Sequence, residues 1–146
     1  MNDIVVDSSV VAKWILPESD SPKAHQLVSE IALQGGRLIV LDLALAEVAN
    51  AIWKRYHQRL ATADESRQFL VSLFRAPVHV EPFNPLLSQA LEIAMKYDRA
   101  IYDALFVALA EELRLSGVTA DEPLVRALHG DYPSIVLLRD WATSAE

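Results

Sequence analysis

Two aspartates follow predicted buried strands near opposite ends of the chain. Asp7 comes directly after the apolar run Ile4–Val6, and Asp121 follows the strand-like segment around Val118 and Thr119. In open α/β sheets, ligands bind outside the carboxyl ends of the strands. Both aspartates therefore stand where their side chains could act on a ligand.

Two further acids lie in helical patterns that border apolar residues. Glu47 stands within LALAEVANAIW, and Asp103 stands within RAIYDALFVALAEEL. Several carboxylates brought together repel one another and raise each other's pKa unless a cation offsets their charge. Mg²⁺ or Mn²⁺, which prefer oxygen ligands, would offset that charge if the four acids meet at one edge of a sheet.

Each acid also has a purely structural interpretation. Asp7 and Asp121 are well placed as helix N-caps, and Asp103 could simply favour the positive first turn of its helix. Glutamate is a good helix former, so Glu47 could point to solvent. Taken one at a time the acids favour these structural roles, whereas the set of four favours a metal site.

The elements that would position these acids alternate along the chain. Short apolar runs predict five strands, at Ile4–Val6, Leu38–Leu41, Val78–Val80, Gly117–Thr119 and Ile135–Leu138. Helical patterns separate most of them, which implies right-handed crossovers and helices on both faces of a sheet. We therefore predict an α/β fold, a three-layer α/β/α sandwich with a mostly parallel central sheet, in a single domain spanning residues 1–146.

Local signals place three helix starts. Ser21-Pro22 and Asn84-Pro85 both read as an N-cap followed by proline at the first helical position. Thr62 and Glu65 have the spacing of a capping box. Apolar residues spaced three and four positions apart predict one buried face on each of three helices. The first face consists of Phe69, Leu70, Leu73 and Phe74; the second of Leu45, Val48, Ala49, Ile52, Trp53 and Tyr56; and the third of Tyr102, Leu105, Phe106, Leu109 and Leu113.

Composition narrows the functional classes. The net charge of −7 argues against broad electrostatic capture of nucleic acid, so a nucleic-acid partner would need a local basic patch. WKRYHQR, residues 53–59, is one candidate, and a solvated helix end is the alternative. The chain has no cysteine, which excludes disulfides and thiolate metal sites. Because we find neither a secretion signal nor an apolar run of about 20 residues, we expect a cytoplasmic protein without membrane contact.

Four segments together resemble the PIN-domain family, in particular the VapC-type toxin ribonucleases of toxin–antitoxin pairs. VVDSSVVAKWILPE resembles the family's opening strand with its first aspartate, and AEVANAIW resembles its glutamate helix. IYDALFVALAEEL resembles the third acidic segment, and VTADEPLVRAL resembles the last. The order and spacing of the segments agree with the family over nearly the whole chain.

This resemblance implies a metal-dependent endoribonuclease that hydrolyses RNA phosphodiester bonds. The acidic residues that would bind Mg²⁺ or Mn²⁺ and carry catalysis are Asp7, Glu47, Asp103 and Asp121, with hydroxyl support from Ser9 and Thr119. The implied partners are RNA, a small antitoxin and a second copy of the chain in a homodimer. Scattered basic residues such as Arg99 would shape RNA recognition, and the roles of Asn50, Asp98 and Glu122 stay open.

Other functional classes compete with this one. A dehalogenase-type phosphotransferase needs a second aspartate two residues after Asp7, where this chain has Ser9, and a receiver domain needs a later lysine that we do not find after a strand. A non-catalytic binding module, whose acids are all caps, is a further alternative, as is a PIN nuclease outside any toxin–antitoxin pair. A histidine-based ribonuclease is disfavoured because the histidines lack ligand spacing; they are His25, His57, His79 and His129.

Overall fold

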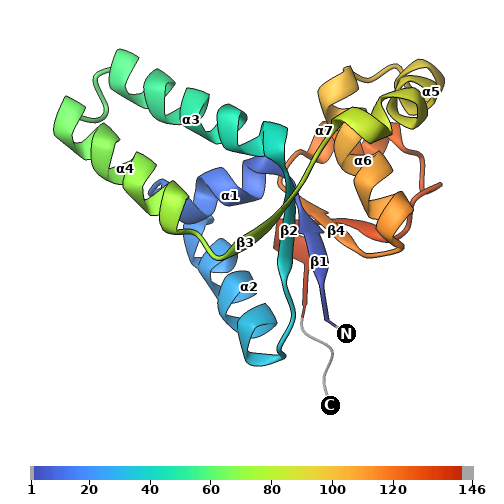
Figure 1. The fold of residues 1–146 in the computed structure, drawn as a ribbon, viewed down its shortest axis with the longest axis horizontal. Coiled ribbons are helices and arrows are strands. Elements are labelled where there is room, and N and C mark those ends of the chain that lie inside the picture. Colours follow the sequence, from blue (N-terminus) through green and yellow to red (C-terminus); the bar gives the residue numbers. More distant parts are fainter. Residues whose placement is uncertain (1, 143–146) are drawn as a thin grey trace.

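The computed structural model describes residues 2–142 and contains a five-stranded sheet in the order β3-β2-β1-β4-β5 (Figure 1). The strands are β1 (Ile4–Val6), β2 (Leu38–Leu41), β3 (Val78–Glu81), β4 (Gly117–Thr119) and β5 (Ile135–Leu137). All neighbouring strands pair in parallel. The predicted α/β fold and the five predicted strands are confirmed, although β3 is one residue longer than expected and β5 is one residue shorter.

Helices fill every crossover between strands that follow one another in the chain. They are α1 (Ser8–Ile15), α2 (Ser21–Leu33), α3 (Asp42–His57), α4 (Ala63–Arg75), α5 (Leu87–Tyr97), α6 (Ile101–Leu113) and α7 (Glu122–Ala127), with short 3₁₀ helices at Asn84–Leu86 and Leu138–Asp140. None of the helices between residues 2 and 142 has the length and apolar character that a membrane crossing needs.

One of the three predicted helix starts is confirmed in detail and two are shifted. The capping box at Thr62 opens α4, because the Thr62 hydroxyl accepts from the N–H of Glu65 while the Glu65 carboxylate accepts from the N–H of Thr62. Asn84-Pro85 was expected to open an α-helix and instead opens a 3₁₀ turn, where the N–H of Leu86 donates to the carbonyl of Phe83. The α-helix begins three residues later.

The second shifted start is that of α2, where Ser21 is the first helical residue and not the N-cap. Its hydroxyl is engaged in the preceding loop: it donates to the carbonyl of Leu16 and accepts from the N–H of Glu18, each at 2.8 Å. The side chain therefore fixes the turn between α1 and α2 and is not available to cap the helix.

Two apolar cores lie on opposite faces of the sheet. Successive residues of a strand point to opposite faces, and in β1 the side chain of Val5 packs with α5, α6 and α7, whereas Ile4 and Val6 pack with α1, α2 and α3. β2 divides in the same way. The predicted three-layer arrangement is confirmed, because both faces of the sheet are covered by helices.

The pair formed by α3 and α4 extends past the sheet as an arm (Figure 1). Val48 lies over the sheet and is buried, whereas Trp53 and Tyr56, further along α3, are 54% and 48% exposed. On α4, Leu73 is buried but Phe74 is 77% exposed. The predicted burial of Trp53, Tyr56 and Phe74 is therefore wrong, as is that of Tyr102 on α6, which is 57% exposed, because no other element of the described chain covers these side chains.

Candidate active site

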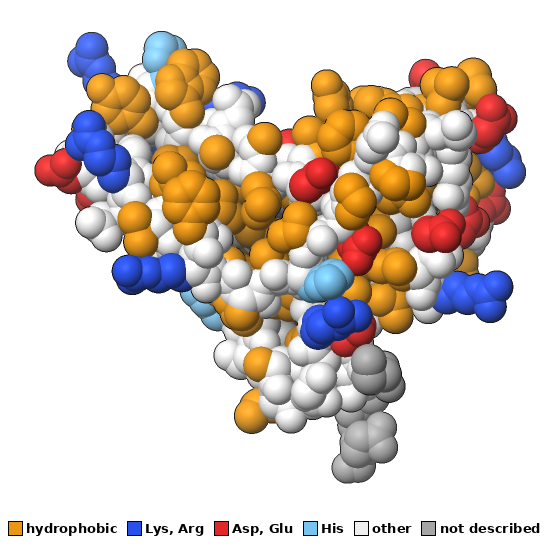
Figure 2. Space-filling model, viewed as in Figure 1, with side chains coloured by type: hydrophobic (Ala, Val, Ile, Leu, Met, Phe, Trp, Pro, Cys, Tyr) orange, Lys and Arg blue, Asp and Glu red, His pale blue; other side chains and the backbone are white. Residues whose placement is uncertain are grey.

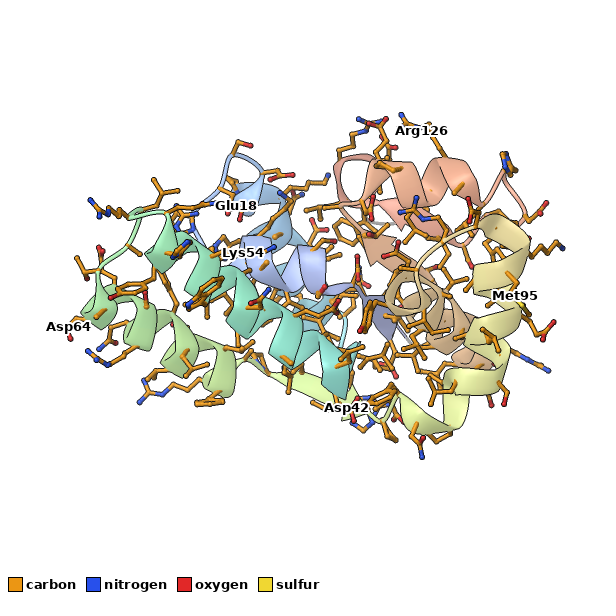
Figure 3. All side chains as sticks on the ribbon, turned by 90° about the horizontal axis from the view of Figure 1, so that it is seen from above. Glu18, Asp42, Lys54, Asp64, Met95 and Arg126 are labelled. Carbon is orange, nitrogen blue, oxygen red and sulfur yellow. The ribbon has the colours of Figure 1, made fainter. Side chains whose placement is uncertain are left out.

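The carboxyl ends of the strands meet between two lobes, one formed by α3 and α4 and the other by α5, α6 and α7 (Figure 3). Figure 2 shows the surface hollowed between these lobes, with acidic side chains beside the hollow. β1 lies between β2 and β4, with Val6 paired to Val118 in β4. The chain segments that follow β1 and β4, which carry Asp7 and Asp121, are therefore brought to the same edge, at the switch point where parallel α/β sheets bind ligands.

Asp7 is the N-cap of α1, and both of its carboxylate oxygens accept hydrogen bonds. Oδ1 accepts from the N–H of Ser8 at 2.9 Å, and Oδ2 accepts from the hydroxyls of Ser9 and Thr119, each at 2.8 Å. A simple N-cap side chain accepts from the second or third N–H of its helix. Asp7 instead accepts from the first N–H, that of Ser8, and from the hydroxyls of Ser9 and Thr119. Its orientation is thus set largely by side chains from α1 and β4.

Thr119 and Ser9 connect Asp7 to the segment that follows β4. The Thr119 side chain is fully buried, and its hydroxyl also accepts from the N–H of Asp121 at 3.1 Å. The hydroxyl of Ser9 accepts from the N–H of Ala120 at 3.0 Å. The two hydroxyls predicted as supports therefore contact Asp7 and also hold the backbone that leads to Asp121.

Asp7 and Glu47 lie close enough to Asp103 for its charge to act on them. Burial raises the pKa of Asp7, although its hydrogen bonds from Thr119, Ser9 and Ser8 oppose this, and the charge of Asp103 raises it further. Glu47, in α3, is the most exposed of the four acids, but partial desolvation raises its pKa, with added contributions from the charges of Asp7 and Asp103. A hydrogen bond from the Ser8 side chain acts in the opposite direction on Glu47.

Asp103 and Asp121 share a cation that belongs to the chain. Arg99 donates to Oδ2 of Asp103 from Nε at 3.2 Å and from Nη2 at 2.9 Å, and the same Nη2 lies 3.8 Å from Oδ2 of Asp121. Asp121 also caps α7, because its Oδ1 accepts from the N–H of Leu124 at 3.2 Å. Sequence reasoning treated Arg99 only as a scattered basic residue, although its position four residues before Asp103 is the spacing of an ion pair.

The structure gives a role to two of the three residues left open by the sequence. Asp98 ends α5 in the left-handed region, with φ of 55°, and its N–H donates to the carbonyl of Ala94. Glu122 pairs with Arg139 at 2.8 Å. Asn50 lies on an exposed part of α3. Asp98 and Glu122 thus have structural roles that need no part in a metal site.

The four acids fit a divalent metal by chemistry more than by their present spacing. Within residues 2–142, no three histidine, aspartate or glutamate side chains are drawn together as around a bound ion. The donors are all carboxylate oxygens, the type that Mg²⁺ and Mn²⁺ prefer. In the described chain, the groups that oppose the raised pKa values of Asp7 and Glu47 are hydroxyls and a backbone N–H, not basic side chains. A cation is therefore electrostatically favoured beside these two residues.

Known proteins resemble the chain in sequence and in fold. The PIN domain family model matches residues 4–127. Ribonuclease VapC3 of Pyrobaculum aerophilum is 36% identical over 135 residues, which span 91% of this chain and 97% of that protein.

Two solved structures share the fold at low sequence identity. VapC20 of Mycobacterium tuberculosis, described as a sarcin–ricin loop cleaving toxin, has a TM-score of 0.64 and 18% identity, and the match covers 86% of this chain and 95% of that one. A toxin–antitoxin complex from Klebsiella pneumoniae has a TM-score of 0.59 and 18% identity, with 99% of both chains covered. These two structures share the fold, and the family model and the VapC3 relative show that the chain belongs to the PIN domain family.

Proposed function

We propose that this protein is a metal-dependent endoribonuclease that acts as the toxin of a toxin–antitoxin pair. Family membership and the 36% identity to a protein named a ribonuclease support the nuclease part. The observation that carries the proposal is that burial, and after it the charge of neighbouring carboxylates, raises the pKa of Asp7 and of Glu47 at the carboxyl edge of the sheet. Carboxylates that repel one another there, without a basic partner for two of them, call for a metal ion.

Asp7, Glu47 and Asp103 would hold the ion, and Asp121 would complete the acidic site from the start of α7. Bound there, Mg²⁺ or Mn²⁺ would activate a water molecule for attack on the phosphodiester and stabilise the attacking and leaving oxygens. Ser9 and Thr119 would keep Asp7 in one orientation through their two hydroxyl bonds. Because the carboxylates alone would repel the phosphate of RNA, cleavage should require the metal.

The basic segment at the end of α3 is the proposed contact for the RNA backbone. Lys54 lies on the face of the α3 arm that is seen from above in Figure 3. Arg55 is already bonded to the carbonyl of Pro17 at 3.1 Å, and His57 stacks on Trp53 with ring centroids 5.0 Å apart. Lys54 is therefore better placed than Arg55 or His57 to contact phosphates. We also propose that the protein acts in the cytoplasm, because its RNA substrate is there.

Two protein partners are also proposed. An antitoxin is supported by the likeness to a toxin–antitoxin complex and by the exposed apolar side chains of the α3–α4 arm. A homodimer is supported by a stripe of exposed apolar residues on α5, which consists of Leu87, Leu91 and Met95. Light scattering that gave a monomeric mass well above micromolar concentration would contradict the homodimer.

The first experiment measures cleavage of a mixed RNA pool by the purified protein with Mg²⁺ or Mn²⁺. Asp7→Asn and Asp103→Asn should each abolish cleavage, as should EDTA. Asp64→Asn is the matched control, because it removes the same charge from a carboxylate that is 94% exposed on α4, and it should cleave like the wild type.

The outcomes separate the nuclease from a binding module. Cleavage that needs the metal, Asp7 and Asp103 would establish the nuclease. Equal cleavage by wild type and the two site variants would point to contamination or a wrong site. No cleavage together with no metal binding by calorimetry would favour the non-catalytic binding module.

A further inference from the structure

Arg99 is held in the acidic site by the backbone of the turn between α5 and α6. α5 ends at Tyr97, Asp98 adopts the left-handed conformation, and the N–H of Arg99 donates to the carbonyl of Ala94 at 3.1 Å. The side chain of Arg99 is only 25% exposed. The guanidinium is therefore a fixed part of the site and not a mobile surface charge.

The guanidinium lies between two of the four acids. Both of its hydrogen bonds to Asp103 go to one oxygen, Oδ2, and the same Nη2 lies 3.8 Å from Oδ2 of Asp121. The other oxygen of Asp121 is engaged by the N–H of Leu124. Neither of these bonds involves Oδ1 of Asp103. Asp103 can therefore bind Arg99 through Oδ2 while Oδ1 is available on the side of Asp7 and Glu47.

The acidic site thus has two halves with different charge compensation. On one side, Asp7 accepts hydrogen bonds from two hydroxyls and a backbone N–H, and within residues 2–142 neither Asp7 nor Glu47 forms an ion pair with a basic side chain. On the other side, Asp103 and Asp121 already share the permanent positive charge of Arg99. Enzymes that cleave phosphodiesters with two metals place the ions about 3.5–4 Å apart between shared carboxylates. Arg99 stands between the pair of carboxylates that a second ion would need.

We propose that Arg99 replaces a second metal ion, so that the site binds a single divalent ion on the side of Asp7, Glu47 and Asp103. This inference rests on the metal-dependent activity proposed above. A second divalent ion between Asp103 and Asp121 would be repelled by the guanidinium and would compete with it for the two Oδ2 atoms. Arg99 is accordingly a positioning residue, which supplies fixed charge and orients Asp103.

The stoichiometry of metal binding tests the proposal without any activity assay. Calorimetric titration of the metal-free protein with Mn²⁺ should give one ion per chain for the wild type and two for Arg99→Gln, which opens the second half of the site. Arg126→Gln, on the exposed face of α7, removes the same charge nearby and should still bind one ion. Arg99→Lys keeps the positive charge and should also bind one.

Thermal unfolding provides a second readout. Without metal, Arg99→Gln should have a lower Tm than Arg126→Gln, because it leaves Asp103 and Asp121 without their shared cation. Saturating Mn²⁺ should then raise the Tm of Arg99→Gln by more than it raises that of the wild type, because a variant that binds an additional ion gains more from binding.

Each result bears on one proposal or on both. Two ions in the wild type, one ion in folded Arg99→Gln, or two ions in Arg99→Lys would overturn the role given to Arg99 and leave the nuclease standing. Absence of any Mn²⁺ binding by the wild type would overturn the metal-dependent nuclease and this inference together. One ion in the wild type and two in Arg99→Gln alone would establish the inference.

Discussion

Replacing Thr119 with valine tests whether its hydroxyl holds Asp7 in place. Thr119 is fully buried, donates to Oδ2 of Asp7 at 2.8 Å and accepts from the N–H of Asp121 at 3.1 Å. Valine has nearly the same shape but cannot make either bond. Both partners would remain in the site with one hydrogen bond fewer, and removing one partner of a buried bond costs more than removing both.

The expected cost follows from the two bonds. A hydrogen bond to a charged group contributes about 1.5–3 kcal/mol and an ordinary one about 1 kcal/mol. The added methyl group of valine returns roughly 0.8 kcal/mol of apolar burial. The free energy of unfolding should therefore fall by about 2–3 kcal/mol, which at a slope of roughly 2 kcal/mol per molar urea lowers the midpoint by about 1–1.5 M.

Urea unfolding in EDTA at neutral pH, followed by circular dichroism, measures this loss. Thr119→Ser is the matched control: it keeps the hydroxyl and removes one buried methyl group, for an expected loss of about 1 kcal/mol. If Thr119→Val lost no more stability than Thr119→Ser, with an unchanged urea slope, the hydroxyl would not be holding Asp7 and the reasoning would be refuted.

Two further predictions address ionisation and capping. Burial raises the pKa of Asp7 in the folded protein above the 3.8 of a free side chain. The stabilisation that protonated Asp7 gives to the folded state is therefore complete below pH 3.8 and is lost as the pH rises through the pKa of the folded protein. The Tm of Asp7→Asn minus that of the wild type, measured in EDTA, should therefore increase between pH 4 and pH 7; a difference that stays constant or decreases would contradict this. Thr62→Ala removes the capping box of α4 and should cost about 1 kcal/mol, with faster amide hydrogen exchange in α4 but not in β1. Unchanged exchange at the first turn of α4 would show that the box contributes nothing.

The sheet could be predicted from the sequence because its strands are short apolar runs separated by helical patterns. Strands buried on both faces lack alternation and stand out as continuous apolar stretches, as in Leu38–Leu41, whose four residues are all buried. The parallel order then brings the ends of β1 and β4 together, which is why Asp7 and Asp121 could be assigned to one edge from the sequence. That these acids bind metal stays a prediction.

The exposure of the α3–α4 arm could not be predicted from periodicity. Apolar residues spaced three and four positions apart identify one apolar face of a helix, but they do not show which other element covers that face. The same pattern describes Val48, which packs over the sheet, and Trp53, which lies beyond its edge. Likewise, the spacing of Arg99 and Asp103 suggests an ion pair, but the approach of Arg99 to Asp121 depends on how α6 and β4 pack.

One of the two hydroxyls that fix Asp7 comes from Thr119, a residue 112 positions later in the chain. During synthesis, at about 5–20 residues per second, Thr119 leaves the ribosome roughly 6–22 s after Asp7. Until then β1 lacks β4, whose segment supplies the carbonyls bonded to the N–H groups of Val5 and Asp7. A nascent chain, or one terminated before Thr119, therefore has no assembled acidic site, and whatever activity the site carries begins only after the segment that carries Thr119 and Asp121 has been synthesised.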